Sequence, residues 1–195
     1  METDTKSRKR DESSVIDAAT VLELGGDILR SPVFAREDEA RHHGDTTTLE
    51  HTLLVALLAC RLARRRILSH RVDLRLLVRA CLLHDLYLYD WHDPDTHGGL
   101  HGFHHPRVAA SNAVSLIGES DGKVISAIET HMFPLTARAV PRHWISWILC
   151  LADKEAAIDD YLGRSGREGL DVLLGYVREC AVAADGQSLK NINRF

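Results

Sequence analysis

The segment RACLLHDLYLYDW, residues 79–91, places a histidine and an aspartate side by side at the end of an apolar helical pattern. Cys81, His84, Asp85 and Leu88 recur at three- and four-residue spacing and therefore share one face of the predicted helix. That face should pack against the core, so the imidazole and the carboxylate would be buried away from solvent. Buried ionisable groups persist when they are paired, hydrogen-bonded or bound to a metal. The pair predicts either a structural His–Asp contact or a metal site, because these two ligand types recur together in such sites.

The composition indicates a soluble globular protein. The chain has 195 residues, of which 45% are hydrophobic and 27% charged, enough for one domain with its own core. Its longest apolar runs reach about half of the ~20 residues that a transmembrane helix needs, and the N-terminus lacks the apolar segment of a signal peptide. We therefore expect a cytoplasmic protein with no membrane partner. The four cysteines lie in helical patterns without a CxxC pair, which is typical of reduced core thiols.

Charge argues against nucleic acid as a partner, whereas histidine content points to a metal site or catalysis. The net charge is −4 at pH 7, and we interpret the arginines between positions 61 and 79 as a solvated rim. Six of the twelve histidines lie between positions 84 and 105. Of these, His92, His97 and His101 fall in a Gly-interrupted loop with no helical frame to aim them. We expect these three to contact solvent or substrate rather than metal.

Helical periodicity throughout predicts an all-α fold, a single-domain bundle of about six to seven helices. No segment shows the alternation of a β-strand. The predicted domain spans residues 15–184. A disordered N-terminal tail over residues 1–14 and a loose C-terminal tail over residues 185–195 are expected to flank it, because such polar segments cannot bury enough surface.

The helix predicted to begin after Thr47 is expected at the centre of the bundle. Glu50 follows Thr47 by three residues and completes a capping-box pattern, which places His51 at the end of the first turn. The sequence that follows is apolar on nearly every side, as in a buried helix. By contrast, the helix predicted over residues 15–29 has a weak middle at Gly25-Gly26, which leaves a break open there.

Six candidate metal ligands occupy inward-facing or terminal positions of separate predicted helices. They are His51, His84, Asp85, His105, His131 and Asp153. Each alone also fits a structural role, but the six together in one small helical domain predict a site for divalent iron, manganese or zinc. A carboxylate bridges such ions when two of them sit together.

In this order, His…His-Asp…His…His…Asp, the chain resembles the HD-domain superfamily of metal-dependent phosphohydrolases. The resemblance covers about residues 40–160 and rests on short segments around each candidate ligand. They are EHTLLVA at His51, CLLHDL at His84-Asp85, HHPRVAASNA at His105, AIETHMF at His131 and LADK at Asp153. HHPRVAASNA is similar to the HPxxGA segment of the two-metal members, with Ala109-Ala110 in place of Gly-Ala. The cyclic-di-GMP phosphodiesterase branch is not matched, because His131-Met132 replaces its paired histidines and there is no GYP segment.

The resemblance implies an all-helical bundle that binds two divalent ions, iron, manganese or similar. In the family's pattern the first His, the His-Asp pair and the last Asp hold one ion. The two intervening His hold the other, and the aspartate of the pair bridges both. A metal-activated hydroxide would then attack the phosphorus of a small nucleotide-like or other phosphorylated metabolite.

The same resemblance suggests which residues take part in the reaction. The catalytic candidates are Asp85 and Lys154. Asp85 would act as the bridging carboxylate, and Lys154, beside the last ligand, would supply a positive charge to the phosphoryl oxygens. Substrate-binding candidates flank the ligands or lie in nearby loops. They are His43, Glu50, His104, Arg138 and Arg142. For each arginine, a solvated surface position fits equally well.

Two other classes of function stay open. Some members of the superfamily are mixed-valence di-iron oxygenases, and others are regulatory modules that bind a metal or nucleotide without turnover. The complete ligand set argues against the regulatory module. Substrate identity and a homo-oligomeric state are not readable from the sequence, since specificity depends on loop shape.

Overall fold

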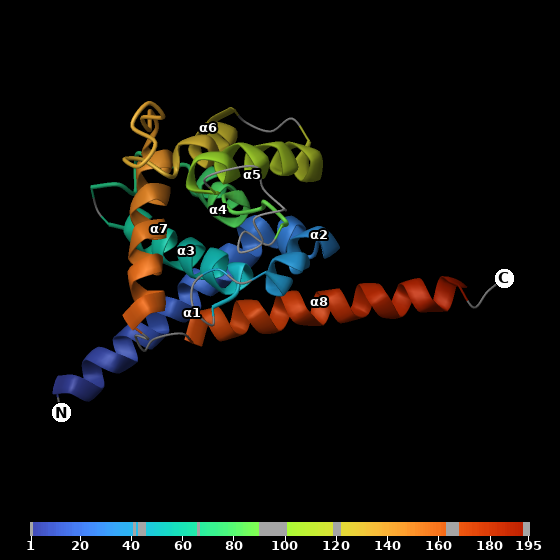
Figure 1. Ribbon diagram of the computed structural model, residues 1–195. Coiled ribbons are helices and arrows are strands. Elements are labelled where there is room, and N and C mark those ends of the chain that lie inside the picture. Colours follow the sequence, from blue (N-terminus) through green and yellow to red (C-terminus); the bar gives the residue numbers. More distant parts are fainter. Residues whose placement is uncertain are drawn as a thin grey trace.

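The computed structural model describes residues 2–40, 42, 46–65, 67–89, 101–118, 122–162 and 168–192. Within them every element is helical, which confirms the all-α prediction (Figure 1). The elements are α1 (Glu2–Leu29), α2 (Pro32–Ala35), the 3-10 helix η1 (Arg36–Glu39), α3 (Thr48–Ala63), α4 (Leu74–Leu83), α5 (His101–Ile117), α6 (Gly122–Thr130), α7 (Trp144–Leu162) and α8 (Glu168–Ile192). The short α2, with Pro32 in its first turn, adds one helix to those predicted. None of the described helices has an apolar stretch long enough to cross a bilayer.

Helix α3 lies at the centre of the bundle, as its sequence predicts. The Thr47 hydroxyl accepts a hydrogen bond from the Glu50 N–H at 3.2 Å, and the Glu50 carboxylate accepts one from the Thr47 N–H at 3.2 Å, which confirms the capping box. Nearly every residue that follows in α3 is buried. The helix packs against α1, α4, α7 and α8, so its first turn, with His51, is held between several neighbours.

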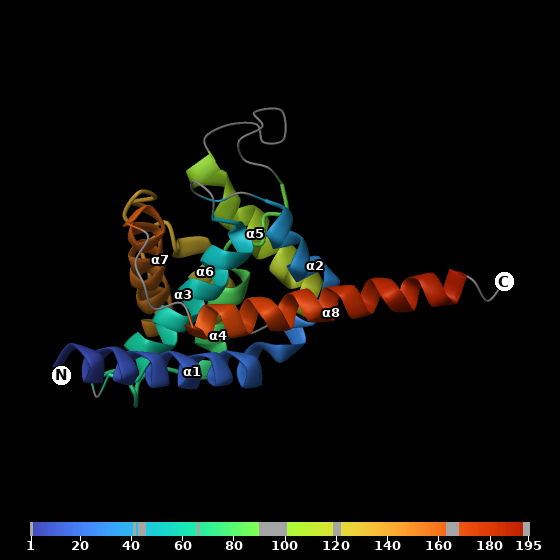
Figure 2. The ribbon, with the colours of Figure 1, turned by 90° about the horizontal axis from the view of Figure 1, so that it is seen from below.

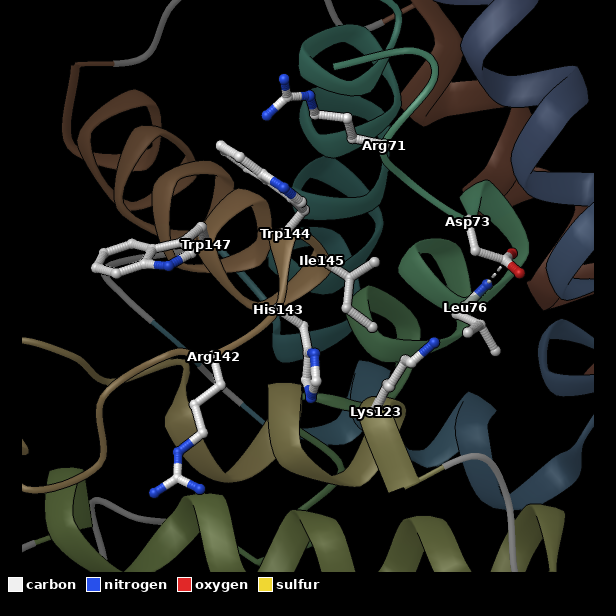
Figure 3. Close-up of a pocket in the computed structure, with 9 residues that line it drawn as sticks. All are labelled: Arg71, Asp73, Leu76, Lys123, Arg142, His143, Trp144, Ile145 and Trp147. Carbon is white, nitrogen blue, oxygen red and sulfur yellow. Dashed lines mark hydrogen bonds between the residues drawn. The ribbon is translucent and has the colours of Figure 1, made fainter.

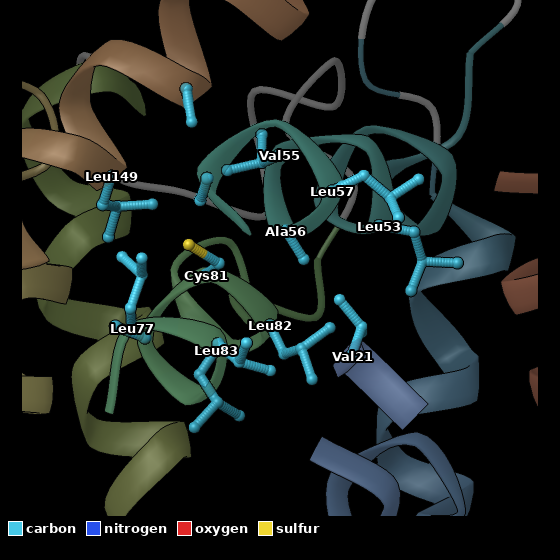
Figure 4. Packing of buried hydrophobic residues seen from close by; sticks show 14 of the residues in the cluster. Val21, Leu53, Val55, Ala56, Leu57, Leu77, Cys81, Leu82, Leu83 and Leu149 are labelled. Carbon is cyan, nitrogen blue, oxygen red and sulfur yellow. The ribbon is translucent and has the colours of Figure 1, made fainter. Parts of the chain in front are cut away.

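The core fills the space between α3 and α4 (Figure 4). Leu53 and Ala56 of α3 face Leu82 of α4, and Val21 of α1 and Leu149 of α7 complete the cluster. All five side chains are at most 1% exposed. Burying one leucine contributes roughly 1.5–3 kcal/mol, so this packing fixes where α4 ends and thus where His84 and Asp85 lie.

Helix α1 continues through Gly25-Gly26, where the sequence left a break open. Helix α4 explains the first glycine, because a Cβ on Gly25 would overlap Leu82 Cδ1 and lie 3.2 Å from Val78 Cγ1. Both leucine and valine are fully buried and have little room to move. Gly25 therefore lets two helices approach closely, at the cost of helix propensity.

We expect Gly25→Ala to be less stable than Gly26→Ala by about 1–3 kcal/mol. Both substitutions gain the same helix propensity, but only the alanine at position 25 overpacks against α4. A Cβ on Gly26 meets only the flexible end of Arg30. Urea denaturation of both variants measures the difference. Equal stabilities would show that α1 and α4 separate without cost.

Both ends of the chain differ from the predicted tails. Helix α1 already begins at Glu2, and α8 continues to Ile192, its C-terminal half extending beyond the other helices (Figures 1 and 2). Ser14, placed in the predicted tail, is buried, and its hydroxyl accepts a hydrogen bond from the Gly169 N–H at 3.1 Å. Once such contacts anchor part of a helix, neighbouring polar residues extend it without a new nucleation step.

Candidate metal centre

The structure brings together all six candidate ligands that the sequence singled out. His51 lies in the first turn of α3, His84 caps the C-terminus of α4, and Asp85 follows it directly. His131 comes directly after α6, and Asp153 lies in α7. The sixth, His105, belongs to α5, which begins at His101, a residue that the sequence predicted to lie in a loop. The five apart from Asp153 are no more than 4% exposed, and the Asp153 side chain is 15% exposed.

Asp85 stands between two sets of imidazoles. Its Oδ2 lies 3.2 Å from His42 Nε2 and 3.5 Å from His84 Nε2. Its Oδ1 lies 3.3 Å from His105 Nε2 and 3.7 Å from His131 Nε2. The two oxygens of one carboxylate therefore face different histidines.

Asp153 completes the first of these sets. Its Oδ1 lies 3.2 Å from His51 Nε2 and 3.9 Å from His84 Nε2. Donor atoms of these three residues all lie within 4.8 Å of one another, close enough to share one ion. The same holds for His84, Asp85 and His131.

Backbone carbonyls set the orientation of two of the rings. His84 Nδ1 donates to the Cys81 carbonyl at 2.8 Å, and His131 Nδ1 donates to the Ile128 carbonyl at 2.7 Å. A carbonyl only accepts, so Nδ1 of both rings carries a proton, and Nε2 is the nitrogen that points into the cluster. Burial, with the nearby His105 and His84, lowers the pKa of His131 to about 3, which keeps this ring neutral at pH 7.

The donor set fits a cation. His84 Nε2 is buried and has no hydrogen-bond partner among the described residues, yet it faces carboxylate oxygens of Asp85 and Asp153. A buried ring nitrogen that faces carboxylate oxygens needs a positive charge beside it, either a proton or a bound cation. His105 Nε2 and His131 Nε2, 2.8 Å apart, likewise need a proton or a cation between them. Imidazole with carboxylate suits borderline divalent ions such as iron, manganese or zinc.

Both carboxylates remain ionised despite their burial. Burial alone would raise the pKa of Asp85, but the adjacent His84 and hydrogen bonds from His105 and His42 hold it well below its usual value. For Asp153, the hydrogen bond from His51 and the other histidines likewise outweigh burial and lower the pKa. The ionised form is the one that binds metals.

The turn after Asp85 is fixed by a strained residue and a side-chain amide. Leu88 adopts the left-handed conformation with a φ of 58°. Asn112 of α5 donates from its side-chain amide to the Leu86 carbonyl at 2.7 Å. The segment that begins with the His-Asp pair is thereby tied to the helix that carries His105.

His42 is a member of the cluster that sequence reasoning missed. Its ring stacks on His51, with centroids 3.8 Å apart and planes at 16°, and its Nε2 reaches Asp85. The sequence prediction singled out the adjacent His43, which lies outside the described residues. The adjacent His42 and His43 were the only sequence signal for a ligand in this segment. Without helical periodicity, the sequence does not indicate which of the two side chains turns inward.

Glu37 of η1 was also missed. It is 1% exposed, and burial together with the charge of Asp85 raises the pKa of its carboxyl group well above the usual value, which favours the neutral acid. The segment around Glu37, Arg36–Glu39, consists of charged residues and has no apolar pattern that would predict burial. Its burial depends on tertiary packing that local sequence does not indicate.

A cavity of about 680 Å³ opens onto the cluster. Asp85, His105, His131 and Asp153 form its polar wall, and the apolar wall includes Leu135. Lys154 also lines it. The Lys154 ammonium donates to the His131 carbonyl at 3.2 Å and lies 3.7 Å from Asp153 Oδ2.

None of the other described substrate-binding candidates lines this cavity. Glu50 serves the α3 cap, and its carboxylate lies 4.0 Å from Arg178 of α8. His104 and Arg138 are exposed. Arg142 lines a different cavity at the start of α7. Substrate contacts from these residues therefore remain predictions.

Comparison with known proteins gives one match. A protein-family model described as the HD domain matches residues 48–158, which is more than half of the chain and includes every position from His51 to Asp153. Neither the curated proteins nor the solved structures gave a match.

Proposed function

Because the chain belongs to the HD-domain family, we propose that it is a divalent-metal-dependent phosphohydrolase. Its substrate would be a phosphate ester or anhydride of a small nucleotide-like or other phosphorylated metabolite. The observation that carries this proposal is the position of Asp85, whose oxygens face different sets of imidazoles, as a carboxylate between two ions must.

The contacts suggest how the ligands divide. His51, His84 and Asp153, with one oxygen of Asp85, would hold the first ion. The second would be held by the two histidines near the other oxygen, which are His105 and His131. His42 would add a nitrogen on the side of the first ion. The second set has fewer protein ligands, which leaves positions for substrate.

When bound, divalent ions would supply Lewis acidity, polarising a phosphoryl oxygen and lowering the pKa of a water. The chain itself keeps Asp85 and Asp153 ionised through their histidine neighbours. Hydrogen bonds to the Cys81 and Ile128 carbonyls keep the Nε2 lone pairs aimed at the cluster. The cavity has the size of a small-molecule site, and Lys154 brings a positive charge to its wall.

Lys154→Ala is expected to lower kcat about a hundredfold with metal content unchanged, because an ammonium directed at a developing phosphoryl charge contributes mainly in the transition state. Steady-state kinetics with parallel metal analysis measures both effects. Arg65→Ala, an exposed cation after α3, is the matched control and should change neither. If the lysine variant loses metal instead, its role is to support Asp153.

The decisive experiment combines metal analysis with an activity screen. Protein purified anaerobically should contain about two divalent ions per chain. It should then release phosphate from at least one member of a panel of nucleotides, dinucleotides and phosphate esters. Oxygen uptake by the iron-loaded protein, without phosphate release, would contradict the proposal and indicate an oxygenase. Metal binding without either reaction would indicate a regulatory module.

A further inference from the structure

A stripe of large apolar side chains runs along the outer side of α7. The helix packs on α3, α4 and α6, and its inner residues, such as Ile145, belong to the core. Trp144, Trp147, Leu151 and Ile158 are instead between 39% and 58% exposed. Figure 3 shows the start of this arrangement, with both indoles extending away from Ile145. An apolar face therefore lies on the side of α7 opposite to the core.

Helical spacing makes these side chains one continuous face. Positions 144, 147, 151 and 158 fall within about 60° of one another around an α-helix and span about 21 Å along it. Lys154 and Glu155 complete the face between Leu151 and Ile158. The Lys154 ammonium is engaged within its own chain, because it contacts the His131 carbonyl at 3.2 Å and lies 3.7 Å from an Asp153 oxygen.

The apolar area of this face is close to what a homodimer needs. The four side chains, together with Leu135, which is 53% exposed, present roughly 500 Å² to solvent. Leu135 lines the metal-centre cavity, as Lys154 does. An interface of standard size buries about 800 Å² per partner, and about 65% of a homodimer interface is apolar. Apolar patches of this size on a single chain mark interaction sites.

The stripe is symmetric about Leu151. Trp144 precedes Leu151 by seven residues, and Ile158 follows it by seven. When two copies of α7 pack antiparallel about a two-fold axis at Leu151, Trp144 of each copy lies opposite Ile158 of the other. The two Leu151 side chains then meet on the axis. Antiparallel packing also brings the positive end of each helix dipole beside the negative end of the other.

The charges beside the stripe are complementary in the same arrangement. The Arg71 guanidinium lies 5.6 Å from the Trp144 ring centroid, whereas Glu155 is exposed in the second half of the face. Neither residue forms an ion pair within the described part of the chain. Positions 144 and 155 lie nearly in line along the helix, about 20° apart. The two-fold axis therefore brings Glu155 of each copy to within about one helical turn of the level of Arg71 in the other.

We propose that the outer face of α7 is the interface of a homodimer, in which two copies pack antiparallel through Trp144, Trp147, Leu151 and Ile158. A second copy matches the spacing of the stripe and the charges at both of its ends, whereas a partner of one charge would match one end. The interface would bury two tryptophans, a residue type enriched at interfaces. The dimer does not depend on metal chemistry at the other site.

The test is sedimentation velocity of the full-length, metal-loaded protein between about 1 and 100 μM. We expect a monomer–dimer equilibrium with a Kd in the micromolar range, because the apolar area only just reaches that of a standard interface. Leu151→Asp should weaken dimerisation at least about tenfold, since two carboxylates would meet on the axis. Val182→Asp is the matched control, because Val182 is 72% exposed on α8 and lies off this face. Circular dichroism establishes that both variants keep their helices.

A charge exchange tests the antiparallel arrangement. Arg71→Glu and Glu155→Arg should each weaken dimerisation severalfold, because like charges then meet twice across the interface. The double variant Arg71→Glu/Glu155→Arg should dimerise more tightly than either single variant, since the facing charges are again opposite. The proposal is overturned if the wild-type protein stays monomeric at 100 μM, which would leave the face to a different macromolecule. It is also overturned if Leu151→Asp dimerises like the wild type, if Val182→Asp weakens the dimer as much, or if the double variant is weaker than both single variants.

Discussion

Asp85→Asn should release both ions together and reduce turnover by more than a hundredfold. The substitution keeps the size of the side chain but removes the charge that faces both sets of imidazoles. Losing even an outer-shell partner of a metal ligand costs about 10–100-fold in affinity or activity, and a bridging ligand is closer to both ions. Metal analysis after dialysis, with phosphate-release kinetics, measures the two effects.

His131→Ala is the matched comparison for this result. Its Nε2 faces only one oxygen of Asp85, so this variant should lose mainly one ion. Circular dichroism of both variants establishes that the helices remain. If Asp85→Asn and His131→Ala lose the same amount of metal, the division of ligands between two ions is wrong.

His105→Ala should abolish measurable turnover with the fold intact, whereas replacing the three loop histidines should not. His105 lies against both Asp85 and His131, and α5 holds it rigidly. His92 and His97 lie outside the described residues, and His101 begins α5. The triple variant His92→Gln/His97→Gln/His101→Gln should keep its metal content and change at most the KM for substrate.

The comparison is decisive in one direction. Metal content by atomic absorption and kcat are measured on the same preparations. If the triple variant loses metal while His105→Ala keeps full activity, the assignment of ligands through HHPRVAASNA is wrong. The two-metal proposal would then have to be abandoned.

Much of the site could be predicted because regular helices carry information at fixed spacing. The capping box at Thr47 and Glu50 predicted where α3 begins, and with it the inward position of His51. The face shared by Cys81 and His84 predicted that the His-Asp pair would be buried. Residues on different helices then met because their apolar faces share one core.

Residues outside regular helices could not be placed in the same way. His42 lies in an irregular segment and Glu37 in a 3-10 helix, so neither belonged to a pattern that separates inward from outward positions. Arg142 shows a related limit, since the sequence left both a substrate contact and a solvated position open for it, and it lines the other cavity. Arg142 precedes α7 in a segment without helical periodicity, so its sequence position near His131 did not determine which cavity it would line.

The close contact between Ser14 and Gly169 has a consequence for synthesis of the chain. Helix α8 packs on α1 and α3, and a Cβ on Gly169 would overlap the Ser14 carbonyl oxygen, so the first and last helices meet without a gap. Until residues 168–180 have left the ribosome, the apolar surface that Leu170 and Leu173 later cover stays open on the nascent protein. Exposed surface of this kind binds chaperones and promotes aggregation. We therefore expect chaperone binding and aggregation to decrease once α8 has been released and has packed on α1 and α3.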